Sequence, residues 1–103
     1  MNGATFRATR ERLGLTTRWV SEELDVRERT VHRWESEASP IPEGAVGALD
    51  SWVALHDWHV EQAGDPVVVP FKGQHDGYPA SWWRAIAAEA RREQGSGIEY
   101  EGA

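Results

Sequence analysis

The sequence predicts a mainly α-helical fold of four to five helices, completed by a small C-terminal α+β element with two short strands. Apolar residues recur at helical spacing through most of the chain. Glycine and proline clusters divide it into segments of helical length, and one β-branched run stands near the C-terminal third. A length of 103 residues is enough for one domain with an appended element. We expect a first part over residues 1–63 and an extension over residues 64–103.

Three short helices are predicted in the first half. The first covers about residues 4–13 and ends at Gly14, which tolerates the left-handed backbone of a helix end. The second begins after Thr16 or Thr17, either of which can cap it, and runs to about residue 24. The third covers about residues 28–37 and stops before Pro40 and Pro42, because two prolines cannot continue a helix.

The second half begins with a long predicted helix, over about residues 43–62. Its apolar residues cover more than one stripe, which is typical of a helix buried from two sides. A short strand is expected at Val67–Val69 and a second at Ile98–Tyr100, because β-branched and aromatic residues favour strands. Between them we expect a polar loop over residues 72–79 and a fifth helix over about residues 79–93.

Composition excludes several classes of protein. The chain has no cysteine, which rules out disulfides, thiol catalysis, cysteine-bound zinc and iron–sulfur clusters. No apolar run is long enough for a membrane span, and the N-terminus lacks the apolar core of a signal peptide. We therefore expect a cytoplasmic protein with no membrane partner.

Charge is unevenly distributed along the chain. The formal net charge is −6, yet residues 1–34 carry seven arginines against five acidic residues. Residues 35–103 carry four basic residues against twelve acidic ones. A modestly basic head on an acidic body would turn one face toward a polyanion. A solvated charged surface is the simpler interpretation of the same distribution.

The second and third predicted helices form the most informative segment. Two short helices joined by a tight turn, the second rich in exposed polar groups, are the arrangement that places a recognition helix in the DNA major groove. Such helices need a small residue where they cross, and Ser21 occupies that position. The apolar residues that would fix the crossing are Val20, Leu24, Val26, Val31 and Trp34.

Candidate DNA contacts follow from helical phase. Arg29 is the first candidate for reading bases, because it lies in the first turn of the recognition helix and arginine commonly reads guanine. His32 and Glu28 are further candidates for base readout on the same outward face. The residues expected at the DNA backbone are Thr16, Thr17, Arg18, Arg27 and Arg33.

This segment resembles the Cro/C1-type (Xre) helix-turn-helix family over roughly residues 4–49. The matching residues are Arg10, Leu13-Gly14-Leu15-Thr16, Val26, Thr30-Val31 and Arg33-Trp34-Glu35. The resemblance implies that Arg10 and Glu35 form a structural ion pair. Four departures matter. Asp25 stands where the family's turn usually has glycine, and Arg27 replaces the usual serine or threonine cap of the third helix. Ser21 replaces the usual alanine, and Thr9 occupies a position that is commonly apolar.

Residues 50–103 are similar in layout to the YdiL-like and anti-CRISPR-associated repressors, which implies a C-terminal dimerisation region. The apolar residues in excess of what the head needs to cover are expected at the dimer interface: Trp52, Trp58, Val68, Trp82 and Trp83. The sequence thus predicts a homodimeric transcriptional repressor, an autoregulator that binds a palindromic operator on double-stranded DNA. No cofactor is implied.

Other functions are weighed against this prediction. His56 and His59 have a spacing that can hold zinc, but nothing fixes further ligands, so we expect a solvated helix face and no metal site. No nucleophile is placed for catalysis by His75 and Asp76, so no enzyme is expected. An antitoxin-like or sigma-binding interaction module and a MerR-like excisionase remain alternatives, and RNA binding stays open.

Overall fold

A computed structural model describes residues 1–102, and over that range the chain forms five helices and four short strands. The predicted mainly helical fold with a small C-terminal element that contains short strands is confirmed. The elements are α1 (Gly3–Arg12), α2 (Thr17–Glu23), α3 (Glu28–Glu35), α4 (Glu43–Glu61), β1 (Val67–Val69), β2 (Gln74–His75), β3 (Tyr78–Pro79), α5 (Ala80–Gln94) and β4 (Ile98–Tyr100).

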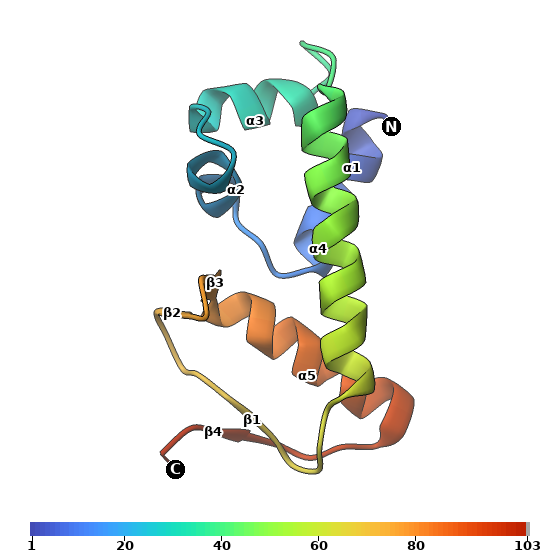
Figure 1. Ribbon diagram of the computed structural model, residues 1–103, viewed down its shortest axis with the longest axis vertical. Coiled ribbons are helices and arrows are strands. Elements are labelled where there is room, and N and C mark those ends of the chain that lie inside the picture. The colour runs from blue at the N-terminus through green and yellow to red at the C-terminus, as the bar shows by residue number, and fades with distance from the viewer. Residues whose placement is uncertain (103) are drawn as a thin grey trace.

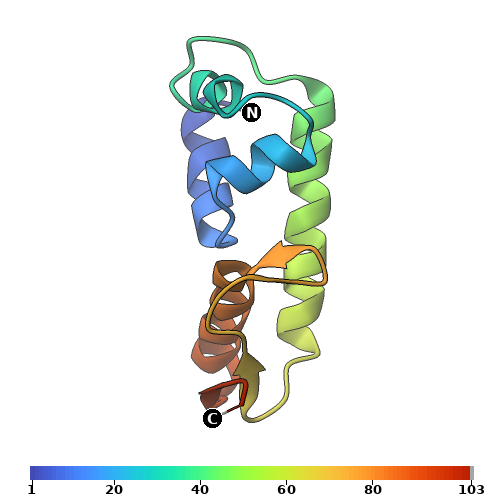
Figure 2. The same ribbon diagram turned by 90° about the vertical axis from the view of Figure 1, so that its left-hand side faces the viewer.

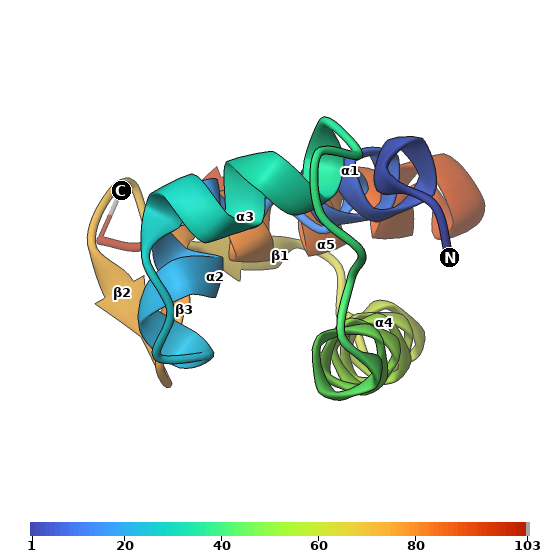
Figure 3. The same cartoon turned by 90° about the horizontal axis from the view of Figure 1, so that it is seen from above.

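The long helix α4 runs along the longest axis of the molecule, which measures 42 × 24 × 18 Å (Figure 1). Helices α1, α2 and α3 lie beside its N-terminal half, while α5 and the strands lie beside its C-terminal half (Figure 2). Seen from above, α1, α2 and α3 all lie on one side of α4 (Figure 3). Buried side chains from both halves, including Phe6, Leu49, Trp82 and Ile86, form one hydrophobic cluster.

The first three helices begin and end where local chemistry directs. Asn2 caps α1 by accepting from the Thr5 amide at 2.8 Å, and the Thr16 hydroxyl caps α2 by accepting from the Trp19 amide at 3.0 Å. Gly14 and Asp25 adopt left-handed φ angles of 73° and 53° in the two connecting turns. Aspartate visits this region more readily than most side chains, so the missing glycine is tolerated.

The strands of the extension form two small sheets. β1 and β4 pair in parallel, with Val67 opposite Ile98 and Val69 opposite Tyr100. β2 and β3 pair antiparallel in a hairpin within the segment for which the sequence predicted only a polar loop. Left-handed φ angles at Asp76 and Gly77 close the hairpin turn. Backbone pairing in two-residue strands leaves no periodic signal in the side chains, which is why the sequence did not predict them.

Two aromatic residues predicted at a dimer interface lie instead in the core of the chain. Trp82 is fully buried and Trp52 is 7 % exposed, so neither presents a surface to a partner. The prediction that His56 lies on a solvated face is also wrong. His56 is 1 % exposed and packs edge-on against Trp82, with the ring centroids 4.9 Å apart. The reason is α5, whose apolar face covers the side of α4 that would otherwise meet water.

Among residues 1–102, no helix combines the length and apolar character that crossing a membrane requires.

Candidate nucleic-acid interface

The packing of α2 against α3 sets the orientation of the candidate recognition helix. Val20 of α2 and Val31 of α3 are fully buried between the helices. Ser21 is buried at the same contact, and its hydroxyl donates to the Arg18 carbonyl at 2.7 Å, so the small polar side chain costs no unpaired donor. The predicted role of Ser21 as the small residue at the crossing agrees with this placement.

The Arg10–Glu35 ion pair is confirmed and joins α1 to the end of α3. Arg10 Nε donates to Glu35 Oε2 at 2.6 Å and Nη2 donates to Oε1 at 2.9 Å, a two-bond arrangement. Nη1 donates to the Leu15 carbonyl at 2.9 Å, so the loop that leads into α2 is held as well. The hydrogen bond to Glu35 raises the pKa of Arg10, against the opposing effect of burial.

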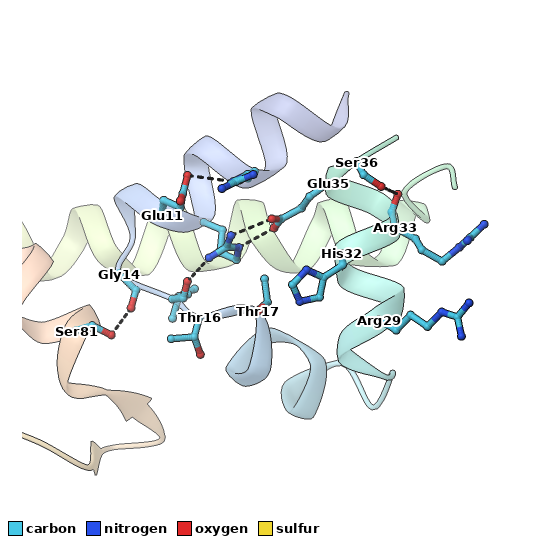
Figure 4. A pocket seen from close by; sticks show the side chains of 13 residues that line it. Glu11, Gly14, Thr16, Thr17, Arg29, His32, Arg33, Glu35, Ser36 and Ser81 are labelled. Atoms are coloured by element: carbon cyan, nitrogen blue, oxygen red, sulfur yellow. Dashed lines mark hydrogen bonds and ion pairs between the residues drawn. The ribbon is translucent and has the colours of Figure 1, made fainter. Parts of the chain in front are cut away.

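The outward face of α3 carries the predicted base-reading residues. Arg29 and Arg33 extend from α3 away from the neighbouring helices, while His32 points toward Thr17 (Figure 4). Arg33 donates to the Ser39 hydroxyl at 3.0 Å, whereas Arg29 has no ion-pair or hydrogen-bond partner within residues 1–102. An extended guanidinium with no internal partner is available to a ligand at its full donor capacity.

Glu28 is engaged by its neighbours. Its Oε2 accepts a hydrogen bond from the Thr17 hydroxyl at 2.7 Å and lies 3.7 Å from His32 Nε2. The sequence predicted Glu28 as a base reader without revealing that it links the two helices. The structure brings Thr17, Glu28 and His32 into one exposed group between α2 and α3.

The remaining predicted backbone-contacting residues frame this face. Arg18 is 81 % exposed at its side chain and forms an i, i+4 pair with Glu22 at 3.1 Å. Thr16 is exposed at the start of α2, and its hydroxyl hydrogen stays free to donate while the oxygen caps the helix. Arg27 precedes α3 and is exposed, and it makes no side-chain cap with the part of the chain described here.

An open hollow of about 740 Å³ lies among α1, α3 and the start of α2 (Figure 4). Arg7, Arg29 and Arg33 contribute cations to its lining, and Ser81 of α5 also contributes. The sequence predicted no role for Ser81 at this face. The only signal was Gly14, whose left-handed backbone admits α5: the Ser81 hydroxyl donates to the Gly14 carbonyl, and a Cβ on Gly14 would overlap the Ser81 backbone.

Several apolar side chains of the C-terminal half are exposed. Trp58 is 53 % exposed and Val68 is 58 % exposed, in line with their predicted place at a dimer interface. Trp83 is half-buried, and its indole nitrogen donates to the His75 carbonyl at 3.0 Å. The exposed apolar residues that sequence reasoning missed are Phe71, Ile98 and Tyr100.

Metal ligands do not gather anywhere among residues 1–102, where no group of three or more such side chains is found. His56 is enclosed, and burial lowers its pKa to about 4, so it is neutral at physiological pH. Neither ring nitrogen of His56 has a hydrogen-bond partner within the described chain. Burial also lowers the pKa of His59.

No protein-family model matches this chain, and no curated protein sequence is significantly similar to it.

Proposed function

We propose that the protein is a sequence-specific, DNA-binding transcriptional repressor that binds an inverted-repeat operator as a homodimer. The observation that carries this proposal is the outward face of α3, where Arg29 and Arg33 extend away from a rigidly supported helix pair (Figure 4). A short helix that rests on a second helix and presents exposed arginines matches the form and chemistry of major-groove recognition. The resemblance of residues 4–49 to the Cro/C1-type family supports the same function.

Charge distribution favours this orientation on DNA. The first 34 residues hold seven of the eleven basic residues, whereas the remainder of the chain carries twelve acids. A polyanion is attracted to the basic end and repelled by the acidic end, so the protein approaches DNA with its N-terminal helices first. The uneven distribution of charge within a net charge of −6 therefore favours one docking face.

Each side chain on the proposed face has a distinct role. Arg29, in the first turn of α3, reads a base edge, most simply the O6 and N7 atoms of guanine. Arg33, Arg18 and Arg27 neutralise phosphates, which fixes the register of the helix without reading sequence. Thr16 adds a hydroxyl donor at the start of α2, whereas Thr17, whose hydroxyl donates to Glu28, can contribute only after that bond is exchanged for one to a phosphate.

The dimer is proposed to form through the C-terminal half. One DNA-binding module of this type buries only about 600–1,000 Å², so specific affinity calls for two modules on a two-fold axis. Parallel sheets are ordinarily covered on both faces, yet β1 and β4 form a two-stranded parallel sheet with Val68 and all of β4 exposed. A second copy of the chain covers this surface, together with Trp58.

Binding of the purified full-length protein to the DNA upstream of its own gene tests this function. A fluorescence-anisotropy titration on this duplex and on a scrambled duplex, at several salt concentrations, gives both specificity and electrostatics. If a dimer neutralises about six to eight phosphates, log K falls with log salt at a slope of roughly −5 to −7. Equal, weak binding to both duplexes with a slope near zero contradicts the proposal.

A protein-interaction module is the second candidate. Its specific support is the exposure of Phe71 and Trp58, at 67 % and 53 %, on the acidic half of the chain. A module of this kind retains the helix pair but binds a protein through the apolar surface. The slope near zero described above is the result that favours it.

A further inference from the structure

We infer that residues 71–79, which contain the β2–β3 hairpin, form a wing that contacts the DNA sugar-phosphate backbone beside α2. This inference rests on the proposed function and extends it to a part of the chain outside the helix pair. The wing is defined here as Phe71 to Pro79.

The wing is held rigidly although residues 71–77 are all exposed. Alternate backbone carbonyls along the segment each accept a hydrogen bond from α2 or from the first half of α5. These bonds are Arg84 Nη1 to the Phe71 carbonyl (3.0 Å), the Ala80 amide to the Gly73 carbonyl (2.9 Å), Trp83 Nε1 to the His75 carbonyl (3.0 Å) and Trp19 Nε1 to the Gly77 carbonyl (2.8 Å). An exposed segment whose backbone is fixed in this way presents its side chains with little backbone ordering cost on binding.

The wing lies directly beside α2. Trp19 of α2 stacks on Tyr78 of β3, with ring centroids 5.3 Å apart, and Tyr78 stacks in turn on the buried Trp82 at 4.4 Å. In Figure 2 the orange hairpin lies immediately below the blue α2, and Figure 1 shows the same neighbourhood. The aromatic stack therefore ties the position of the wing to the helix pair.

A shallow hollow of about 220 Å³ joins the wing to the proposed backbone-contacting residues. Gln74 of β2 lines it together with Thr16, the residue that caps α2, and with Arg18 and its ion-pair partner Glu22 of α2. A phosphate held by Thr16 and Arg18 thus has the Gln74 side chain in the same hollow. The ligand that suits all three is a phosphodiester, which accepts from hydroxyl, guanidinium and amide donors.

The chemistry of the wing fits a backbone contact that carries no sequence information. Lys72, the single lysine of the chain, is an exposed flexible cation that precedes β2. Lys72 and Gln74 have no side-chain hydrogen-bond or ion-pair partner within residues 1–102. The acidic residue of the wing, Asp76, is exposed in the turn between β2 and β3, and its charge raises the pKa of His59 of α4 against the larger lowering by burial.

Tethered cleavage tests the position of the wing directly. The chain has no cysteine, so Gln74→Cys creates a single thiol for an iron chelate that cuts nearby DNA backbone. Glu93→Cys, near the C-terminal end of α5, is the matched control. We expect focused cuts at the flank of each protected half-site from the first conjugate and none from the second. Protected DNA without focused cuts overturns the wing alone, whereas wild-type protein that protects no DNA overturns the proposed function as well.

Affinity measurements supply an independent readout. Lys72→Ala should weaken operator and scrambled DNA alike, by about 3- to 10-fold, and reduce the salt slope by about one for each Lys72 removed. Arg92→Ala removes an exposed cation near the end of α5 and should change neither quantity. Equal thermal unfolding of both variants and the wild type excludes misfolding. A slope that Lys72→Ala leaves unchanged overturns the inference.

Discussion

The Thr17 hydroxyl donates to Glu28 Oε2 at 2.7 Å and so joins the first turn of α2 to the first turn of α3. This exposed bond lies on the face proposed to meet DNA. It holds a carboxylate near the position proposed for DNA phosphates, and it engages Glu28, one of the further residues predicted to read bases. The charge of Glu28 repels a polyanion, while the hydrogen bond between Thr17 and Glu28 fixes the position of α2 relative to α3.

Glu28→Gln separates these two effects. The amide keeps an acceptor for Thr17 but removes the negative charge, so affinity for scrambled DNA should rise while unfolding free energy changes by less than about 1 kcal/mol. Anisotropy titrations on scrambled duplex measure the gain. Glu93→Gln, which removes the same charge near the end of α5, should produce a smaller gain. A fall in affinity for scrambled DNA would show that Glu28 itself binds DNA.

Arg29→Ala should relax sequence preference. Loss of a bidentate base contact is expected to cost about 1–3 kcal/mol on the operator and much less on scrambled DNA. Arg33→Ala should weaken both duplexes alike, because phosphate contacts carry no sequence information. Competition between the two duplexes for each variant decides the assignment. Equal losses for Arg29→Ala would make Arg29 a phosphate contact and move base reading to His32 or Glu28.

Arg10→Ala should destabilise the fold, and DNA affinity should fall as a consequence. The side chains of Arg10 and Glu35 are only 10 % and 7 % exposed, so removal of one partner strands a charge in a poorly solvated site, at a cost of about 3–5 kcal/mol. Arg7→Ala breaks an exposed pair with Glu11 and should cost less than about 1 kcal/mol. Urea unfolding compares the two variants. Unchanged stability beside lost binding would mean that Arg10 contacts DNA directly.

Stability should depend on the protonation of His56. Burial lowers its pKa from 6.5 to about 4, so the unfolded chain binds this proton more readily than the folded one between these values. The contribution of neutral His56 is complete above about pH 6.5, and roughly 2 kcal/mol of it is lost by pH 5. His56→Leu should flatten this difference and preserve stability at pH 8, since neither ring nitrogen has a partner within the described chain. Parallel pH slopes for variant and wild type would contradict the assignment.

Val68→Asp should prevent dimerisation without unfolding the chain. Val68 is 58 % exposed on β1, so a carboxylate there costs little in the monomer but is stranded between two copies. Sedimentation at micromolar concentration should show a wild-type dimer and a monomeric variant. The variant should still unfold cooperatively, with a melting temperature lowered only by the stabilisation that dimerisation adds. A wild-type monomer under these conditions refutes the dimer itself.

Local chemistry made the helices predictable. The residues that begin and end the helices act on their sequence neighbours, as do Thr16, Gly14 and the prolines after α3, so the sequence alone predicts their effects. Each helix boundary lies within a few residues of its expected place. The Arg10–Glu35 pair was predicted as well, through the family resemblance. Burial of His56 and Trp82 depends instead on α5 packing against a long apolar helix, a contact between segments far apart in sequence.

The wing was hidden for a different reason. Its four carbonyl hydrogen bonds use backbone acceptors that every residue possesses, and three of the four donors belong to α5. A polar, glycine-containing loop and a rigid hairpin therefore share one sequence signature. Only the placement of α5 relative to α2 distinguishes them.

The contact between Ser81 and Gly14 makes the N-terminal helices dependent on α5. The Ser81 hydroxyl donates to a carbonyl in the turn between α1 and α2, and the absent Gly14 side chain leaves room for the α5 backbone. Residues 1–63 are consequently not a unit that can be transferred without α5. If residues 1–63 were grafted onto another protein, they would lose Trp82 from the shared core and the support behind the turn that leads into α2. Any redesign of the proposed operator specificity therefore has to be made in the whole chain.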